Sequence, residues 1–265
     1  MNKIILIILL LYPLQLLQGS IVVLNGLTHT HQVEHGKVYK GKIEIQNAGN
    51  HPQSVKIFLQ DYSYQSNGVV EYNAPNTNHK TNSNWLKLNT NLVTLGVKEK
   101  AEIHYELTIP EWLAEPGSYW SVIMVEPVDD INPIKEESGI NIRSIVRYAI
   151  QIITDYESDQ GKPELKFNSV NLEQKDSKKT LKVAVSNAGN LYCKTMASIE
   201  IYDRTNGEKV GIYRSDLISL LPNTSKTINI DLSQVPPNKY NAVLIAVDEE
   251  ENAFALNVEL EIKDE

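Results

Sequence analysis

Apolar and polar side chains alternate strictly along the segment Ala101–Ile109. Its apolar members are Ala101, Ile103, Tyr105, Leu107 and Ile109. Alternation of this length predicts a β-strand with one face in a hydrophobic core and the other in water. Phe254–Ile262 repeats the pattern, whereas apolar residues at helical spacing are missing and only Glu111–Glu115 suggests a single helical turn. The chain is therefore predicted to be all-β.

Further segments of this kind follow one another along the chain, with turn residues between them. The predicted strands are Lys42–Gln46, Val55–Leu59, Tyr119–Val125, Ile140–Ile153, Leu181–Val185, Ala197–Tyr202, Ile228–Leu232 and Ala242–Val247. Many short strands separated by turn signals predict a β-sandwich or a barrel.

The same order of parts occurs twice. The tetrapeptide Asn-Ala-Gly-Asn closes a predicted strand at 47–50 and again at 187–190. Downstream of each copy come a Leu-x-x-Leu segment, an alternating strand, a proline and a tyrosine that opens the next strand. We therefore predict two tandem β-sandwich domains, at 21–156 and 162–265, joined by the polar linker Asp155–Pro163.

The first 20 residues have the pattern of a secretory signal peptide. A short positive start at Lys3 precedes the apolar run Ile4–Leu17, and the small residues Gly19 and Ser20 follow. The run is shorter than the ~20 residues of a spanning helix. No later stretch of the sequence is long and apolar enough to cross a bilayer. We expect an exported chain with no membrane span after cleavage, located in the periplasm or at the cell surface.

Charge and cysteine content exclude several classes of protein. The net charge is −8, with acidic residues scattered along the chain, so a nucleic-acid partner is not expected. The single cysteine, Cys193, excludes an internal disulfide and is predicted to be a packed thiol at the start of a strand. Nucleophile-elbow, phosphate-loop and zinc-protease motifs are missing from the sequence. We expect no enzyme activity and no cofactor.

Two sets of residues are candidate binding sites of other kinds. His29, His31 and His35 share one face of a predicted strand, but ~3.3 Å per residue separates them too widely to chelate one ion, so no metal is expected. Trp120 is assigned to the core. Trp85 and the tyrosines near 62–72 form the alternative hypothesis, a surface or cell-wall module that stacks a glycan on exposed aromatic rings.

The segment Ile140–Ile153 suggests the main functional hypothesis. It predicts a strand of about 14 residues with an apolar face, and the opposite face carries Arg143 and Arg147. A long strand at the end of a sandwich suits β-augmentation, in which a partner's strand pairs with its main chain. Arginine is suited to bidentate contact with a partner's carboxylate. The opposing interpretation is a core strand with solvated arginines.

These features resemble the periplasmic pilus-chaperone (PapD-like) superfamily, which has two immunoglobulin-like domains. Gly41–Asn47 is similar to its early strand and asparagine turn, Tyr119–Pro127 to its penultimate strand, and Ile140–Tyr148 to the last strand of its first domain. The resemblance implies that Ile140 and Ile142 donate side chains to an incomplete exported subunit. It also implies that Arg147 anchors the carboxylate at the subunit's C-terminus.

The chain departs from that pattern at the first strand. Leu24–His29 has no counterpart of the family's second basic residue. The sequence also resembles the extracellular WxL-interacting family, whose paired immunoglobulin-like domains bind cell wall and partner proteins. Both resemblances imply a protein that binds an exported partner, pilin-like or at the surface. The predicted partner-binding residues are Ile140, Ile142, Arg143 and Arg147.

Overall fold

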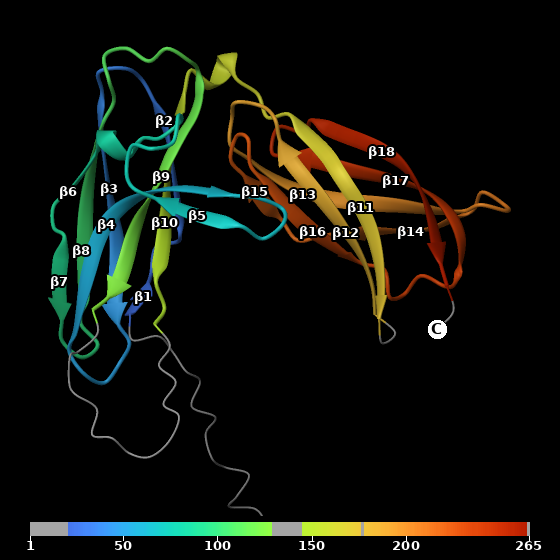
Figure 1. Ribbon diagram of the computed structural model, residues 1–265, viewed down its shortest axis with the longest axis horizontal. Helices are drawn as coiled ribbons and strands as arrows, with labels where there is room; N and C mark the ends of the chain where they lie inside the picture. Colours follow the sequence, from blue (N-terminus) through green and yellow to red (C-terminus); the bar gives the residue numbers. More distant parts are fainter. Residues whose placement is uncertain (1–20, 129–144, 176–177, 264–265) are drawn as a thin grey trace, which may run out of the picture.

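A computed structural model describes residues 21–128, 145–175 and 178–263, and it consists of two β-sandwiches in tandem (Figure 1). The short 3-10 helix η3 (Ser158–Gln160) lies in the connection between them. The predicted fold class, two immunoglobulin-like β-sandwiches, is confirmed. The signal peptide expected at residues 1–20 lies outside the described residues, and the boundaries 21–156 and 162–265 stay a prediction.

The first sandwich is built from the strands before η3. They are β1 (Ile21–Val23), β2 (Thr28–Val33), β3 (Val38–Asn47), β4 (Gln53–Tyr64), β5 (Val70–Asn73), β6 (Leu86–Leu88), β7 (Leu92–Leu95), β8 (Lys100–Thr108), β9 (Gly117–Pro127) and β10 (Tyr148–Tyr156), with the 3-10 helix η2 at Ser83–Trp85. One sheet has the order β1-β3-β8-β6. The other has the order β2-β10-β9-β4-β5, with β7 also on β4. Alternate residues of β3, β8 and β9 fill the core between them.

The second sandwich repeats this plan. Its strands are β11 (Leu165–Lys175), β12 (Lys178–Asn187), β13 (Cys193–Asp203), β14 (Lys209–Arg214), β15 (Ile218–Leu220), β16 (Ser225–Asp231), β17 (Asn238–Asp248) and β18 (Ala253–Ile262). The sheet orders are β11-β12-β16 and β14-β13-β17-β18, with β15 also on β13. The central strands correspond, because β12, β13, β16, β17 and β18 occupy the places of β3, β4, β8, β9 and β10.

The repeated sequence signals have the same hydrogen bonds in both sandwiches. Asn47 and Asn187 are fully buried. Each side-chain amide donates to the backbone carbonyl four residues on, at 2.7 Å in both cases. Tyr119 and Tyr240 each donate their hydroxyl to the carbonyl four residues back, at 2.8 and 2.7 Å. A tyrosine at this corner that bonds back to the main chain is a hallmark of immunoglobulin-like sandwiches.

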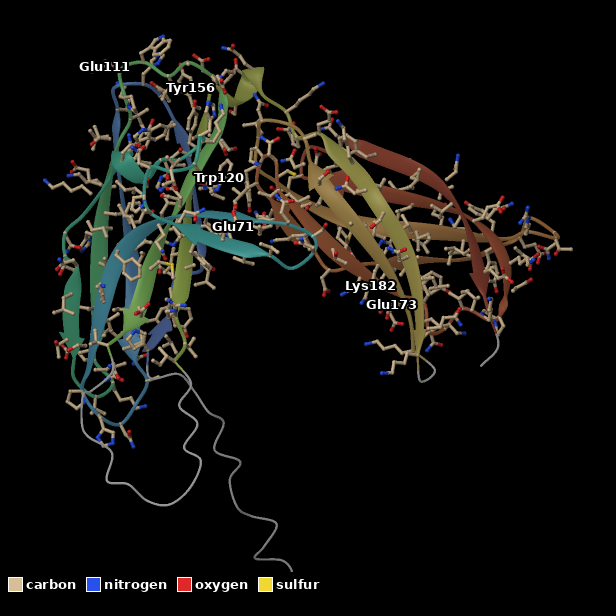
Figure 2. All side chains as sticks on the ribbon, in the orientation of Figure 1. Glu71, Glu111, Trp120, Tyr156, Glu173 and Lys182 are labelled. Atoms are coloured by element: carbon tan, nitrogen blue, oxygen red, sulfur yellow. The ribbon has the colours of Figure 1, made fainter. Side chains whose placement is uncertain are left out.

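A hairpin of the first sandwich reaches the second. In Figure 1 the β4–β5 hairpin projects toward β15 and β16. Tyr64, at the end of β4, belongs to the hydrophobic core of the second sandwich, together with Trp120 and Ile153 from β9 and β10. Figure 2 labels Trp120 on β9, between the two sandwiches. The outer face of β9 is therefore covered, which explains why residues 117–125 are all buried instead of alternating.

The two sandwiches also make close backbone contact at the start of β9. The N–H of Ser118 donates to the carbonyl of Asn190 at 2.8 Å. A Cβ on Gly117 would lie 2.3 Å from that same carbonyl oxygen, so only glycine permits the approach. The asparagine turn at 187–190 thus contributes to the junction as well as to its own sandwich.

The predicted strand Ile140–Ile153 is wrong in its bounds. Strand β10 begins at Tyr148 and ends at Tyr156, and residues 145–147 belong to no strand. Its partner β9 ends at Pro127, which has no N–H to donate, so antiparallel pairing stops there. Residues 140–144 lie outside the described residues. The single helical turn suggested at Glu111–Glu115 is also wrong, because these residues form bends and irregular backbone.

Candidate functional site

The first sandwich has an open strand edge at the end opposite η3. Strand β2 runs parallel to β10, and its first pair joins Thr28 to Gln151. Tyr148–Ile150 therefore pair with β9 on one side, and on the other side no strand of the described residues covers them. An edge of this kind presents unpaired N–H and C=O groups to an incoming chain.

Exposed apolar side chains lie on the two chain segments that lead to this edge. The chain leaves β1 at Val23 and crosses to the other sheet, where the N–H of Gln151 donates to the carbonyl of Leu27 at 2.8 Å. Leu24 and Leu27 on the crossing, and Ile145 and Val146 before β10, are between 40% and 47% exposed. Apolar residues gathered at one end of a domain mark an interaction site. We call these four residues and the edge Tyr148–Ile150 the open end.

Of the four predicted partner-binding residues, only Arg147 lies in the described part of the chain. Ile140, Ile142 and Arg143 lie outside the described residues. Arg147 is exposed beside the open end, and its Nη1 lies 3.2 Å from Oε2 of Glu126. It precedes β10 and lies far along the chain from the junction between the sandwiches. Partner contact by these four residues stays a prediction.

The end of β10 nearest η3 carries an acidic group. Asp155 is buried, and its carboxylate accepts hydrogen bonds from Oγ of Ser118 at 2.5 Å and from Nε2 of Gln32 at 3.2 Å. Burial raises the pKa of Asp155, although the two hydrogen bonds oppose that rise. Gln32 on β2 and Ser118 on β9 thus hold a buried acidic group at this end of β10.

Two of the three histidines considered as metal ligands, His29 and His31, contact the hydroxyl group of Tyr105. Nδ1 of His29 and Nε2 of His31 each lie 3.0 Å from Oη of Tyr105, so they connect β2 with the opposite sheet. Tyr105 reaches them by lying across Gly41, where a Cβ would be 2.2 Å from its ring. His35 lies beyond β2, and its Nδ1 is 3.1 Å from the hydroxyl of Tyr156.

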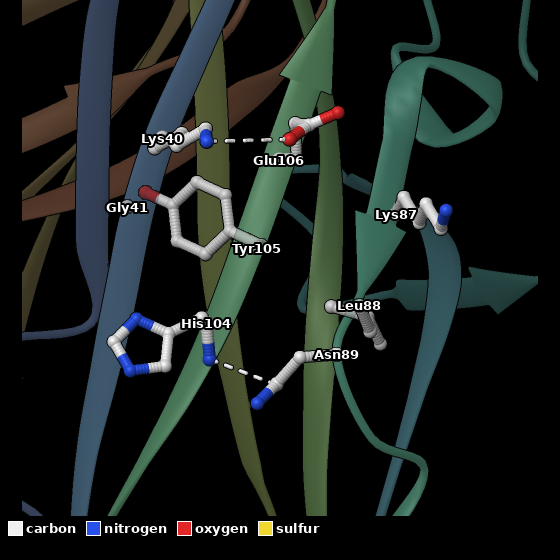
Figure 3. Close-up of a pocket in the computed structure, with 8 residues that line it drawn as sticks. All are labelled: Lys40, Gly41, Lys87, Leu88, Asn89, His104, Tyr105 and Glu106. Carbon is white, nitrogen blue, oxygen red and sulfur yellow. Dashed lines mark hydrogen bonds and ion pairs between the residues drawn. The ribbon is translucent and has the colours of Figure 1, made fainter.

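Gly41 and Tyr105 also line a surface hollow of about 390 Å³ (Figure 3). Lys40 and Glu106 form an ion pair across it with Nζ and Oε2 3.7 Å apart, and both side chains are exposed. The N–H of His104 donates to Oδ1 of Asn89 at 2.9 Å. Lys87 also lines the hollow, so its charged groups are the exposed Lys40–Glu106 pair and this second lysine.

The histidine pair predicts a pH-dependent stability. Burial lowers the pKa of His29 below its usual 6.5, and burial and the charge of His29 lower the pKa of His31. The unfolded chain then binds more protons than the folded protein between the folded and unfolded pKa values. The free energy of unfolding should therefore fall as the pH drops below about 6.5, through the folded pKa values.

Chemical unfolding between pH 5 and 8 measures this effect. The matched variant is His31→Gln, which removes one titrating group and keeps a side chain that can bond to Tyr105. The slope of the free energy against pH should be smaller in this variant than in the unchanged protein. Equal slopes in the two proteins would contradict the prediction.

The aromatic residues of the glycan hypothesis do not form an exposed platform. Trp85 is 7% exposed and packs on Tyr119, with ring centroids 4.9 Å apart. Tyr64 is buried, and Tyr62 lies between Tyr64 and the exposed Tyr72. Sequence reasoning missed Trp112, which is 75% exposed in the loop before β9. Trp120 is buried, as predicted.

Other potential chemistry in the described part of the chain is limited. Cys193 is buried at the start of β13, as predicted, and burial raises its pKa to about 12. No group of three His, Cys, Asp or Glu side chains in the described residues is placed to hold a metal ion. A helix with the length and apolarity needed to cross a membrane does not occur in residues 21–128, 145–175 or 178–263.

The open end itself was only partly visible in the sequence. Ile145 and Val146 fell inside the predicted strand, whereas Leu24 and Leu27 attracted no prediction. The available signal was the pair of apolar residues on either side of Asn25-Gly26, a turn dipeptide. This pattern indicates that the chain turns here and passes from one sheet to the other, so that its two leucines do not lie on one face of a strand.

Comparisons with known proteins extend these observations. The family model for the host binding domain of the WxL Interacting Protein matches residues 137–265. No curated protein matches the chain in sequence.

Several solved chaperone structures are similar along most of the chain. The CsuC–CsuE chaperone–tip adhesion subunit complex of Acinetobacter baumannii is 14% identical, covers 93% of this chain and 100% of that chain, and has a TM-score of 0.48. The chaperone–tip adhesin complex of CFA/I fimbriae is 12% identical, with 90% and 98% covered and a TM-score of 0.46. The YadV chaperone is 15% identical, with 91% and 100% covered and a TM-score of 0.42. The likenesses to pilus chaperones and to WxL-interacting proteins, both drawn from the sequence, are thus confirmed.

Proposed function

We propose that this chain is an exported protein that binds another exported protein, whose extended strand pairs with β10 at the open end. The observation that carries the proposal is the uncovered edge Tyr148–Ile150, which continues the line of β2. A partner strand in that position would supply main-chain hydrogen bonds to Tyr148–Ile150, which pair with β9 but, among the described residues, with no strand on their other side. Such pairing gives affinity with little demand on the partner's sequence.

Specificity in this proposal comes from the apolar side chains. Leu24, Leu27, Ile145 and Val146 would receive alternate side chains of the added strand, so the partner segment should be apolar on one face. Burying their exposed area is favourable by about 25 cal/mol per Å². Arg147 lies beside this contact and can exchange Glu126 for a carboxylate of the partner.

In this proposal the partner's carboxylate meets Arg147 at the open end and not at the junction between the sandwiches. Asp155 occupies β10 there, hydrogen bonded to Ser118 and Gln32. The partner is instead recognised through its main chain and apolar residues. The name of the matched family, an interacting protein with a host binding domain, supports a protein partner. The signal-peptide pattern of residues 1–20 supports export.

A pull-down of the tagged chain from the native envelope fraction tests the proposal. Val146→Asp places a carboxylate in the apolar contact and should reduce the recovered partner about tenfold or more, since an unpaired charge there costs over ~1.4 kcal/mol. Val146 is exposed and outside any strand, so folding should be unaffected. Ile145→Asp should behave in the same way.

The matched control is Leu217→Asp, which adds the same charge to an exposed leucine of the second sandwich. Partner recovery should be unchanged in this variant. Equal recovery with Val146→Asp and with the unchanged chain would refute the open end as the docking site. Polysaccharide recovered without any protein would favour the glycan-binding alternative.

A further inference from the structure

Strand β18 forms an edge of the second sandwich. Ala253–Ile262 pair with β17 along their whole length, and no other strand of the described residues pairs with them. On the edge that faces away from β17, the hydrogen bonds to the neighbouring sheet are made by Lys263, the residue that follows β18. There Gln174 of β11 accepts from the N–H of Lys263 at 3.3 Å and donates to the carbonyl of Lys263 at 3.1 Å.

Comparison of the two sandwiches shows what is missing beside β18. The corner tyrosines align them, because Tyr119 pairs with Thr154 of β10 and Tyr240 pairs with Leu260 of β18. In the first sandwich β2 covers β10 along residues 151–156. In the second sandwich the described residues place no strand at the equivalent position. Among the described residues, the position beside β18 that corresponds to β2 is therefore not occupied by a strand.

This edge has little of the usual protection against pairing. Natural edge strands carry a bulge, a proline or charged side chains, especially lysine, or are very short, and the charges of β18 are limited to Glu259 and Glu261. The edge strands β11 and β14 follow this rule, because their registers shift between Phe167 and Ser169 and opposite Ile201–Tyr202. Strand β18 pairs in unbroken register for ten residues and contains neither proline nor lysine.

The core side of β18 is also incompletely covered. Leu256 is 39% exposed, and Phe254 and Val258 are only partly buried against the core of the second sandwich. In the alignment set by the corner tyrosines, Val258 corresponds to Ile152, which β2 covers in the first sandwich, whereas Phe254 and Leu256 correspond to Tyr148 and Ile150 of the open end. A strand added to β18 would therefore bury apolar area as well as pair the main chain.

We propose that β18 pairs antiparallel with β18 of a second copy of this chain, centred on Asn257. In this register Leu256 lies opposite Val258 of the other copy. Ala255 lies opposite Glu259, and Ala253 lies opposite Glu261. The two acidic residues of each strand thus meet alanines, and like charges do not face each other. Two five-stranded sheets become one continuous sheet across a two-fold axis.

The charge pattern supports this occupant. Residues 253, 255, 257, 259 and 261 lie on the outer face, because they pair with the outward positions of β17. A register in which Glu259 met Glu259 or Glu261 would place like charges directly opposite, which is destabilising. Centring on Asn257 is a register that avoids this over the full length of the strand.

Single substitutions at Ala255 test both the contact and its register. Ala255→Lys places a lysine opposite Glu259 twice, once on each side of the axis, and should lower the dimer Kd. Ala255→Glu places two like-charge pairs there and should raise it. Two cross-strand pairs predict a change of about 2- to 30-fold in each direction. Sedimentation velocity over a concentration series measures the Kd. Thermal unfolding verifies that the variants, changed at an exposed position, remain folded.

Ser198→Glu is the matched control, because Ser198 lies on the same sheet face in β13, between β14 and β17. It should leave the Kd unchanged. Opposite shifts for the two Ala255 variants would establish the pairing. A chain that remains monomeric up to about 1 mM (the limit of a ~4 kcal/mol association) would overturn the proposal. A dimer with the same Kd in all variants would also overturn it.

Discussion

Replacing Tyr64 with alanine should destabilise the protein by about 3–5 kcal/mol. Tyr64 belongs to the core of the second sandwich although it ends a strand of the first. Its hydroxyl donates to the carbonyl of Ser219 at 3.0 Å and accepts from the N–H of Leu221 at 3.1 Å. Nζ of Lys226 lies 4.6 Å from the ring centroid. The substitution removes packing, two hydrogen bonds and a cation–π contact at once.

The second expected effect of Tyr64→Ala is a loss of coupling between the sandwiches. We expect calorimetry to resolve two unfolding transitions in the variant, with the second sandwich melting first. Tyr64→Phe should cost less, about 1–3 kcal/mol, because it keeps the packing but leaves the N–H of Leu221 without its partner. Tyr72→Ala is the control on the same hairpin, where the side chain is exposed. Similar melting of Tyr64→Ala and Tyr72→Ala would contradict the assignment.

Asn187→Ala should have the other large effect, a loss of about 3–5 kcal/mol from the second sandwich, as expected when a buried hydrogen-bond network is broken. The Asn187 amide donates to the carbonyl of Leu191 at 2.7 Å, and its Oδ1 accepts from the N–H groups of Gly189 and Glu164, both at 3.0 Å. Alanine removes all three bonds and leaves the buried carbonyl of Leu191 without this donor. Chemical unfolding measures the loss.

Asn47→Ala is the matched substitution in the first sandwich. Its Oδ1 accepts from the N–H of Gly49 at 2.9 Å, and its amide donates to the carbonyl of Leu95 at 3.2 Å. Hydrogen exchange should show loss of protection in strands before η3 for Asn47→Ala and in strands after it for Asn187→Ala. Asn206→Ala, in an exposed turn, should change neither. Equal stability of Asn187→Ala and Asn206→Ala would exclude the proposed role of the buried amide.

Alternation in the sequence predicted strands wherever one face is in a core and the other in water. Ala101–Ile109 corresponds to β8 (Lys100–Thr108) and Phe254–Ile262 to β18 (Ala253–Ile262). It gave the wrong bounds for Ile140–Ile153 because the length of a strand depends on its neighbour. The end of β9 at Pro127 limits β10, and the pairing between them is not visible in either segment alone.

The hydrophobic pattern did not predict strand β2 or the last residues of β10, because both contain polar residues at inward positions. Strand β2 alternates as the sequence Thr-His-Thr-His-Gln-Val, and its inward positions are histidines held by Tyr105. Thr154 and Asp155 extend β10 beyond Ile153, because Thr154 donates to the carbonyl of Tyr119 and Asp155 accepts from Ser118 and Gln32. A buried polar residue depends on partners from distant strands, so a local hydrophobic pattern does not reveal it.

The core that both sandwiches share has a consequence for biosynthesis. The N-terminal half leaves the ribosome and any export channel first, so the surface with Tyr64 and Trp120 is available before the second half is complete. The core of the second sandwich, which includes strands β12, β13 and β16, is completed by these residues of the first. The N-terminal half thus serves the C-terminal half as a folding template within one polypeptide. The order in which the two halves are made is therefore part of how the second acquires its structure.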